Sequence, residues 1–390
     1  MRILYNRDYR FVLRDGEEER EFIGEYIENN LKVNKRLADR DLWKKTGPGA
    51  RFLGEDISRE ETPLEISLSG LAGLRGEEIV YVANVNDISA IYIKDLSDLE
   101  PGSERHVLHG YARRVKGLSI DRENGRAAVA ASSDGLTYQI TILDLASGED
   151  RTLTDGDIVA DNPSFRGDSV LFNCTLIGRD ENGNFAGYSA SMLYELNLNT
   201  LEVSEMRRDD NLNFVCPKTD AAGNLYFLTR PAAKRRKKSN LFLDILLFPY
   251  RLIKAFVNFL NFFSMSYGGG ALRTTDENPA KSVQKTKKEL FIEGNRIDAE
   301  RNLKENAKKG CEHPGILPKS WQLVRVTPEG EESVLAKGVL AYDVDKSGRV
   351  VYSNGRHMFL WKEGKETHLC ACGLANLVSI LDEGETWKEG

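Results

Sequence analysis

A repeated pattern of short strands broken by glycine turns constrains this chain more than any other feature. Five segments share an apolar start, a turn that contains glycine and a β-rich continuation: "GLRGEEIVYVANV", "SIDRENGRAAVAAS", "SFRGDSVLFNCTL", "KTDAAGNLYFLTR" and "DVDKSGRVVYSNG". Their turn glycines are Gly76, Gly125, Gly167, Gly223 and Gly348. Five further segments carry a strand, a polar turn and a strand: "AIYIKDLSDLEPGSERHVL", "QITILDLASGEDRTLT", "LYELNLNTLEVSEM", "QLVRVTPEGEESVLA" and "MFLWKEGKETHLCA". Alternation of apolar and polar residues between such turns predicts half-buried β-strands.

Four short strands per repeat are typical of a β-propeller blade. The turn glycines lie 49, 42, 56 and 125 residues apart along the chain. The last spacing falls to 36 when the 89 residues from 231 to 319 are set aside. The pattern therefore predicts an insertion over 231–319, placed between the second and third strands of the fourth full blade.

The two chain ends supply the strands of one more blade. At the C-terminus "ANLVSILDE" has the pattern of a first strand, and "MRILYN", "YRFVLRD" and "EREFIGEY" at the N-terminus supply three others. Pairing both ends in one sheet removes open strand edges, which are otherwise prone to aggregation. We therefore expect an all-β fold, a single six-bladed propeller over 1–390, with a connecting segment of mixed helical periodicity over 26–54.

These strand, Asp/Gly turn, strand repeats resemble those of TolB-like propellers and, more loosely, those of the WD-repeat group. The resemblance covers about 300 of the 390 residues, and the WD dipeptide is missing. It implies a six-bladed propeller used for binding and transfers no catalytic residue to this chain.

The predicted insertion is charged differently from the rest of the chain. Residues 231–319 hold 18 Lys and Arg against 9 Asp and Glu, a balance of +9 within a chain whose net charge is −6. A continuous basic run, 234–238, directly precedes the apolar stretch that continues to residue 263. On a helix the polar residues of this stretch fall within about 100° of arc, and they are Asp244, Arg251, Lys254, Asn258 and Asn261.

A basic flank next to an aromatic-rich apolar helix is typical of attachment to an anionic membrane surface. The charged residues near the centre of the stretch offset its insertion energy, and an insertion within one blade has to return to the side it left, so we expect it to lie in the membrane plane. A buried helix, packed on the propeller or on a second copy of the chain, is the alternative. The predicted membrane-binding residues are Lys234, Arg235, Arg236, Lys237, Lys238, Leu241, Phe242, Leu246, Phe248, Ile253, Phe256, Val257, Phe259, Leu260 and Phe263.

No catalytic motif is present: the sequence has no G-x-S-x-G, H-E-x-x-H or phosphate-binding G-x-x-x-x-G-K. We predict no catalytic residues, no cofactor and no metal site, and leave the ligand-binding residues open. Four aspartates near the ends of first strands either face the central channel or, as is commoner, belong to turns. They are Asp121, Asp220, Asp343 and Asp345.

Two short segments contain residue types that bind metals. His368, Cys370 and Cys372 alternate in "HLCACG", which would place them on one strand face, and Cys311 with His313 forms a remote pair in the insertion. We favour small buried thiols for the cysteines. "DENGNF" from Asp180 is similar to the start of a calcium loop, but the twelfth position holds Ser191 where Glu is required, so we expect a hairpin turn.

Cysteine usage and the N-terminus favour a cytoplasmic protein. The 5 cysteines are odd in number and scattered, and the first residues lack the apolar core of a signal peptide. We expect a non-enzymatic scaffold at the inner face of the cell membrane, with a protein partner and without nucleic acid, because the aromatic residues follow an apolar helix face. The alternative is an enzyme or small-ligand binder that uses the central channel, with the insertion as a lid or an oligomer contact.

Overall fold

The computed structural model describes residues 1–45, 64–232, 289–308 and 310–381, except 87, 101, 111, 112, 293 and 294. The chain divides into two compact units. One contains Met1–Ala232 and Asn306–Gly390, and the other contains Ala233–Glu305.

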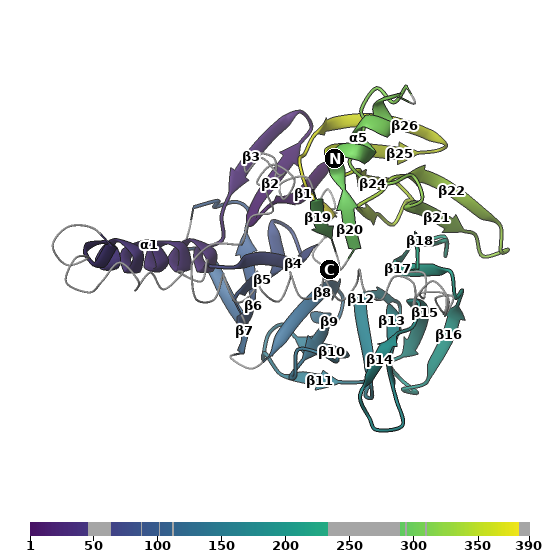
Figure 1. Cartoon of the computed structure of the whole chain (residues 1–390), viewed down its shortest axis with the longest axis horizontal. Helices are drawn as coiled ribbons and strands as arrows, with labels where there is room; N and C mark the ends of the chain where they lie inside the picture. Colours follow the sequence, from purple (N-terminus) through teal and green to yellow (C-terminus); the bar gives the residue numbers. More distant parts are fainter. Residues whose placement is uncertain are drawn as a thin grey trace, which may run out of the picture. The chain divides into compact units, whose positions relative to one another are not determined.

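The larger unit is a six-bladed β-propeller, as predicted (Figure 1). Its six antiparallel sheets each place one strand innermost, and the inner strands contact one another in a closed cycle: β27, β4, β8, β12, β17, β23 and again β27. This cycle surrounds the central channel, and it leaves no gap in the inner ring of strands.

Five blades are continuous in sequence order. The first has β4 (Ile66–Gly73), β5 (Glu78–Val85), β6 (Ile88–Asp95) and β7 (Glu104–Gly110). The second has β8 (Arg114–Asp121), β9 (Arg126–Ser132), β10 (Gln139–Asp144) and β11 (Asp150–Thr152). The third has β12 (Ile158–Arg166), β13 (Ser169–Arg179), β15 (Met192–Asn197) and β16 (Val203–Arg207), with β14 (Phe185–Tyr188) paired to β13. The fourth has β17 (Leu212–Thr219), β18 (Leu225–Pro231), β21 (Gln322–Val326) and β22 (Glu332–Lys337). The last has β23 (Ala341–Val344), β24 (Val350–Ser353), β25 (His357–Lys362) and β26 (Lys365–Ala371).

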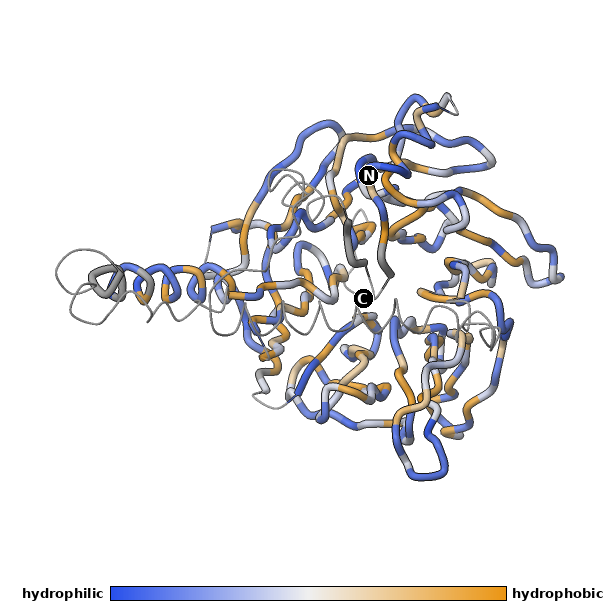
Figure 2. Tube along the Cα trace, in the orientation of Figure 1, coloured by the Kyte–Doolittle hydropathy of each residue, from blue (hydrophilic) through white to orange (hydrophobic). Residues whose placement is uncertain are grey.

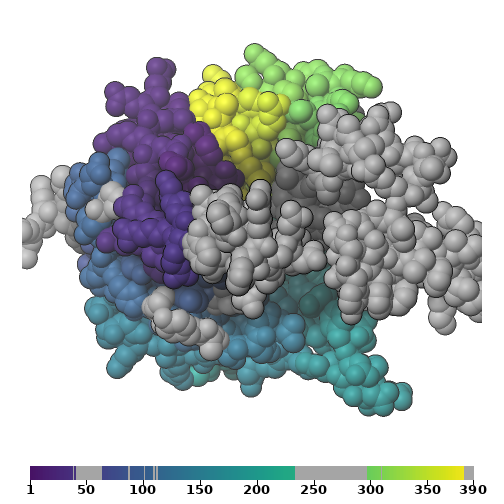
Figure 3. Space-filling view, turned by 60° about the vertical axis from the view of Figure 1, so that its left-hand side comes forward, coloured from purple at the N-terminus to yellow at the C-terminus, as the bar shows by residue number. Residues whose placement is uncertain are grey.

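The sixth blade joins the two ends of the chain, which confirms the predicted closure. Its strands are β27 (Val378–Leu381), β1 (Arg2–Arg7), β2 (Arg10–Asp15) and β3 (Glu18–Phe22). Tyr5 is opposite Val378, and the buried Asn6 side chain donates to Asn376 Oδ1 over 2.6 Å. N-terminal residues thus lie directly against C-terminal ones on the surface of the ring (Figure 3).

The core lies between neighbouring blades. The second strand of a blade packs on both sides, so β9 is buried along most of its length and reads as an unbroken run of small apolar residues, "AAVAAS". Val80 of the first blade, for example, shares a cluster with Val129 of the second. The turns between first and second strands hold left-handed glycines, for example Gly125 with φ of 64° and Gly348 with φ of 80°.

Helix α1 (Glu25–Lys45) follows the closing blade and overlaps the predicted connecting segment 26–54. Its first turns are anchored by Ile27, which is fully buried in a cluster with residues of the closing and first blades. Further along, Val33 and Leu37 are exposed. Most of the residues of α1 are hydrophilic (Figure 2). Among the helices that the structure describes, none is both long enough and apolar enough to cross a bilayer.

The second unit contains a hairpin and the start of a helix. Strands β19 (Glu289–Ile292) and β20 (Asn295–Asp298) pair with each other, and this hairpin was not predicted. Helix α5 (Ala299–Lys308) has the predicted N-cap, because Asp298 Oδ1 accepts a hydrogen bond from Arg301 N over 2.9 Å. Gly310 follows the helix with φ of 76°, as expected for a residue just beyond a helix end.

Candidate functional site

The carboxyl ends of all six inner strands surround a cavity of about 470 Å³, which we call the channel mouth. Each inner strand places at least one residue on it: Gly73, Asp121, Phe165, Thr219, Asp343 and Ile380. A site to which every blade contributes is one that only the assembled ring can form.

One carboxylate links three blades at the channel mouth. Asp343 Oδ1 lies 2.5 Å from Lys218 Nζ, and Asp343 Oδ2 accepts a hydrogen bond from Ile380 N over 2.7 Å. The Asp343 side chain is 15% exposed, so little water competes for these contacts. Asp343 therefore connects the last blade to the fourth blade and to the C-terminal strand that closes the ring.

Two more charged residues hold the opposite part of the channel mouth. Arg122 Nε donates to the Gly73 carbonyl over 3.2 Å, and burial lowers the pKa of the Arg122 guanidinium while the charge of Asp343 opposes that change. Burial raises the pKa of Asp121, but hydrogen bonds from Arg126 and Asn124 outweigh this and leave it below its usual value. The contacts of Asp121 therefore favour its charged form, whereas burial of Arg122 disfavours the charge of its guanidinium.

The other two predicted aspartates belong to turns. Asp220 Oδ1 accepts from Asn224 N over 2.9 Å, and its second oxygen accepts from the hydroxyl of Tyr226. Asp345 Oδ1 accepts from the backbone N–H groups of Ser347 and Arg349, both over 2.9 Å. All four aspartates thus have partners inside the chain, and Asp121, Asp343 and Asp345 also line the channel mouth.

The two ends of the insertion meet the ring at neighbouring positions. Strands β18 and β21 pair directly, with Thr229 opposite Gln322. The buried Arg230 guanidinium lies 4.0 Å from the centre of the Trp321 ring, on the residue that precedes β21. Strands β17 and β18 are antiparallel, so Pro231 at the end of β18 lies opposite Leu212 at the start of β17. The channel mouth lies at the other end of β17, so the insertion leaves the ring on the face opposite the channel mouth.

The predicted membrane-binding residues lie outside the residues that the structure describes. This applies to all of 234–263, including Lys234, Phe256 and Phe259, so their attachment to a membrane stays a prediction.

The expected alternation of His368, Cys370 and Cys372 on one strand face is wrong. The register of β25 and β26 shifts between two pairs, His368 with Phe359 and Cys370 with Met358, so Leu369 is an extra residue. Such a bulge moves the following side chains to the other face of the sheet. Cys372 is buried with Met358, as expected for a small buried thiol, whereas Cys370 is half-buried against the same cluster.

The expected hairpin at "DENGNF" is confirmed. Asp180 Oδ1 accepts from Asn182 N and Asn184 N in the turn that joins β13 to β14. The Asp180 carboxylate therefore stabilises a turn.

No protein-family model matches the chain, and no curated protein matches it. Among solved structures, TolB from Acinetobacter baumannii is similar with a TM-score of 0.49 and 12% identity, over 97% of this chain and 66% of TolB. This chain therefore spans slightly less than two thirds of that protein. A nidogen/laminin complex is similar with a TM-score of 0.49 and 10% identity, over 97% of both chains. The acylaminoacyl peptidase of Pyrococcus horikoshii has a TM-score of 0.37 and 12% identity, over 78% of this chain and 39% of the peptidase.

The order of the strands, independently of these matches, defines the six-bladed propeller that the TolB-like repeats imply. This fold is suited to binding, because a propeller presents a rigid ring with two faces and a channel.

Proposed function

We propose that this protein is a non-enzymatic propeller scaffold that attaches to an anionic membrane surface through residues 234–263. The attachment is peripheral, and the scaffold presents its channel mouth to a protein partner at the cytoplasmic face of the membrane. The proposal combines a sequence feature, the basic and aromatic insertion, with a feature of the ring, the place where that insertion begins and ends.

The pairing of β18 with β21 is the observation that carries this proposal. Thr229 and Gln322 are opposite each other, so the whole insertion leaves and returns at one point on a rigid sheet. A single crossing would leave the returning chain on the far side of the bilayer, whereas a helix in the membrane plane does not. The paired ends therefore favour attachment from one side.

The direction of the exit favours a free channel mouth. The insertion leaves from the face where the inner strands begin, and the channel mouth lies where they end. Residues 231–319 carry a balance of +9 and the remaining chain carries −15, so an anionic surface attracts the insertion and repels the ring.

Vesicle flotation of the full chain tests the attachment. We expect the wild type to float with vesicles that contain phosphatidylserine, and Phe256→Asp with Phe259→Asp to reduce the floating fraction by more than about 10-fold, because two charges enter the apolar face. Phe185→Asp with Tyr188→Asp is the matched control, since these two aromatic side chains are 58% and 56% exposed on β14.

Two results would contradict membrane attachment, and a further measurement identifies the alternative. Equal flotation of wild type and the Phe256/Phe259 variant, or none by the wild type, would refute membrane attachment. Light scattering on the same samples identifies the alternative, because loss of a dimer in the Phe256/Phe259 variant would assign the apolar face to a contact between two copies of the chain.

A second candidate function, small-ligand binding at the channel mouth, is favoured by the contribution of all six inner strands to one cavity. A thermal-shift screen with nucleotides, sugars and short peptides tests it on the wild type and on Leu118→Trp, which fills the cavity. A ligand that raises the Tm of the wild type alone supports this function, and equal shifts of both proteins argue against it.

A further inference from the structure

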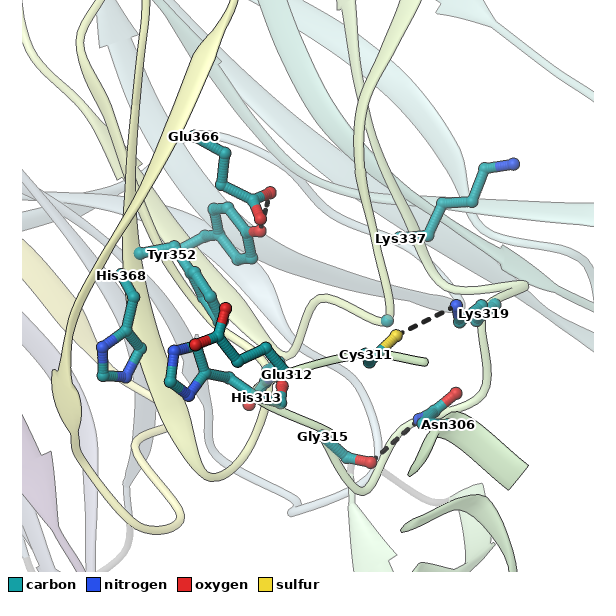
Figure 4. A pocket seen from close by; sticks show the side chains of 13 residues that line it. Asn306, Cys311, Glu312, His313, Gly315, Lys319, Lys337, Tyr352, Glu366 and His368 are labelled. Atoms are coloured by element: carbon teal, nitrogen blue, oxygen red, sulfur yellow. Dashed lines mark hydrogen bonds between the residues drawn. The ribbon is translucent and has the colours of Figure 1, made fainter. Parts of the chain in front are cut away.

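Three histidines from distant parts of the sequence meet in the last blade. His313 comes from the segment that returns from the insertion, His357 begins β25, and His368 lies on β26. The chain has only 5 histidines, so most of them gather at this one place. Beside them lies a cavity of about 370 Å³, which we call the histidine pocket and which His313 and His368 line with Cys311 and Glu312 (Figure 4).

The nitrogen atoms of the three rings are close enough to share one ion. One nitrogen from each ring lies within 4.8 Å of the other two, and His357 Nδ1 is 3.2 Å from His368 Nε2. The rings of His313 and His368 stack with centroids 3.7 Å apart. Tetrahedral ligands with zinc–nitrogen bonds of about 2.0–2.1 Å lie roughly 3.3 Å from one another. Because the His313 and His368 rings stack, the His313 ring has to turn edge-on before both can bind the same ion.

Asn354 fixes the backbone of two of these histidines. Its Nδ2 donates to the His313 carbonyl over 3.1 Å, and its Oδ1 accepts from His357 N over 2.9 Å. The Asn354 side chain is buried, and Gly315 packs so closely on it that an added Cβ would lie 2.6 Å from the Asn354 carbonyl oxygen. The returning segment is therefore held against the turn that begins β25.

The bulge in β26 positions the third histidine. Because Leu369 is an extra residue, His368 shares a sheet face with Phe359 while Cys370 points to the other face.

The chemistry of the three side chains suits a cation. Neutral imidazole nitrogen is a ligand for Zn²⁺, Cu²⁺ and Ni²⁺. Three protein ligands leave a fourth position open, and the adjoining cavity provides room for water or for the Glu312 carboxylate.

We propose that His313, His357 and His368 form a binding site for a divalent transition metal ion of the zinc class. The bound ion joins residue 313, at the returning end of the insertion, to both strands of the outer hairpin of the last blade. The ion thereby fixes the base of the insertion to the ring, independently of what the insertion itself binds.

Zinc titration of the full chain tests the proposal. After treatment with a chelator, the protein is titrated with Zn²⁺ in competition with a chromophoric chelator, and Co²⁺ absorption reports the ligand geometry. We expect one tight equivalent in the wild type, and affinity at least about 100-fold lower for His357→Gln and for His368→Gln, because each loses one of three ligands. His106→Gln is the matched control, because His106 is exposed on β7, outside the site.

Two further measurements separate coordination from folding. Without metal, the variants should keep the wild-type circular dichroism, and added Zn²⁺ should raise the Tm of the wild type and His106→Gln but not of His368→Gln. Asn354→Ala should weaken Zn²⁺ binding by about 10- to 100-fold, as loss of a positioning residue does. Equal Zn²⁺ affinity in the wild type and both ligand variants, or no tight equivalent in the wild type, would overturn the proposal.

Discussion

The channel mouth and the histidine pocket both gather titratable side chains, but they do so in opposite ways. At the channel mouth unlike charges meet, as Lys218 and Asp343 do. Beside the histidine pocket, three side chains of one kind, His313, His357 and His368, lie close together. Unlike charges stabilise each other without a ligand, whereas neighbouring imidazole lone pairs need a proton or a cation between them. The ion pair of Lys218 and Asp343 therefore indicates a structural role, and the three clustered imidazole rings indicate a binding site.

Asp343→Ala should have the largest effect on the channel mouth. It leaves the Lys218 ammonium and the Ile380 N–H without this carboxylate, and we expect a loss of about 3 kcal/mol in the free energy of unfolding. Urea unfolding measures it. Asp157→Ala is the control, because Asp157 and Arg179 form an ion pair whose side chains are 47% and 45% exposed, and such pairs contribute about 1 kcal/mol or less. Equal losses in both variants would contradict a structural role for Asp343.

Gly315→Ala should have a smaller effect on stability and a large one on the histidine pocket. The added Cβ meets the carbonyl oxygen and the side chain of Asn354, so the segment that carries His313 has to move. We expect a loss of about 2 kcal/mol in the free energy of unfolding and weaker Zn²⁺ binding. Gly178→Ala is the control, because its Cβ would come no closer than 3.4 Å to another atom. Wild-type Zn²⁺ affinity in Gly315→Ala would contradict the positioning of His313 by this contact.

Asp345→Asn should have the smallest effect, and one that depends on pH. Burial raises the pKa of Asp345, but hydrogen bonds from Ser347 and Arg349 outweigh this and lower it overall. A carboxyl with a lowered folded pKa adds stability above the unfolded pKa of about 3.9 and loses it as the pH falls through the folded pKa.

We therefore expect Asp345→Asn to lower the free energy of unfolding by about 1 kcal/mol at pH 7, and the difference from wild type to shrink below about pH 4. Unfolding in urea at several pH values measures both. A difference that stays constant down to pH 2.5 would show that the charge of Asp345 adds no stability. Asp210→Asn, at a side chain 85% exposed, is the control.

The ring was predictable from the sequence because local signals repeat in it. Each turn glycine marks a place where the chain needs a left-handed residue, and Gly76, Gly167 and Gly223 all have positive φ. The closing blade followed from the need to pair both ends, and Tyr5 opposite Val378 confirms it. Repetition makes these signals readable without any knowledge of long-range contacts.

The meeting of three histidines was not predicted, although His368 and the pair Cys311 and His313 were named as residue types that bind metals, because nothing local joins them. A single extra residue, Leu369, reverses the strand face expected for Cys370, and no alternation pattern reveals a bulge. His313 reaches His368 only because Asn354 holds the returning segment. One signal was present: His357 and His368 lie on either side of the turn at Gly364, at positions that a hairpin brings near each other.

The direct pairing of β18 with β21 also affects how the ring folds. About 90 residues separate Thr229 from Gln322, and bringing the ends of such a loop together costs about 3 kcal/mol more entropy than closing a four-residue hairpin. This blade therefore depends on its neighbours to hold β18 until β21 arrives. Late assembly of the fourth blade would expose β18 as an open edge while the rest of the ring is complete, a moment at which a chaperone or a second chain has access to it.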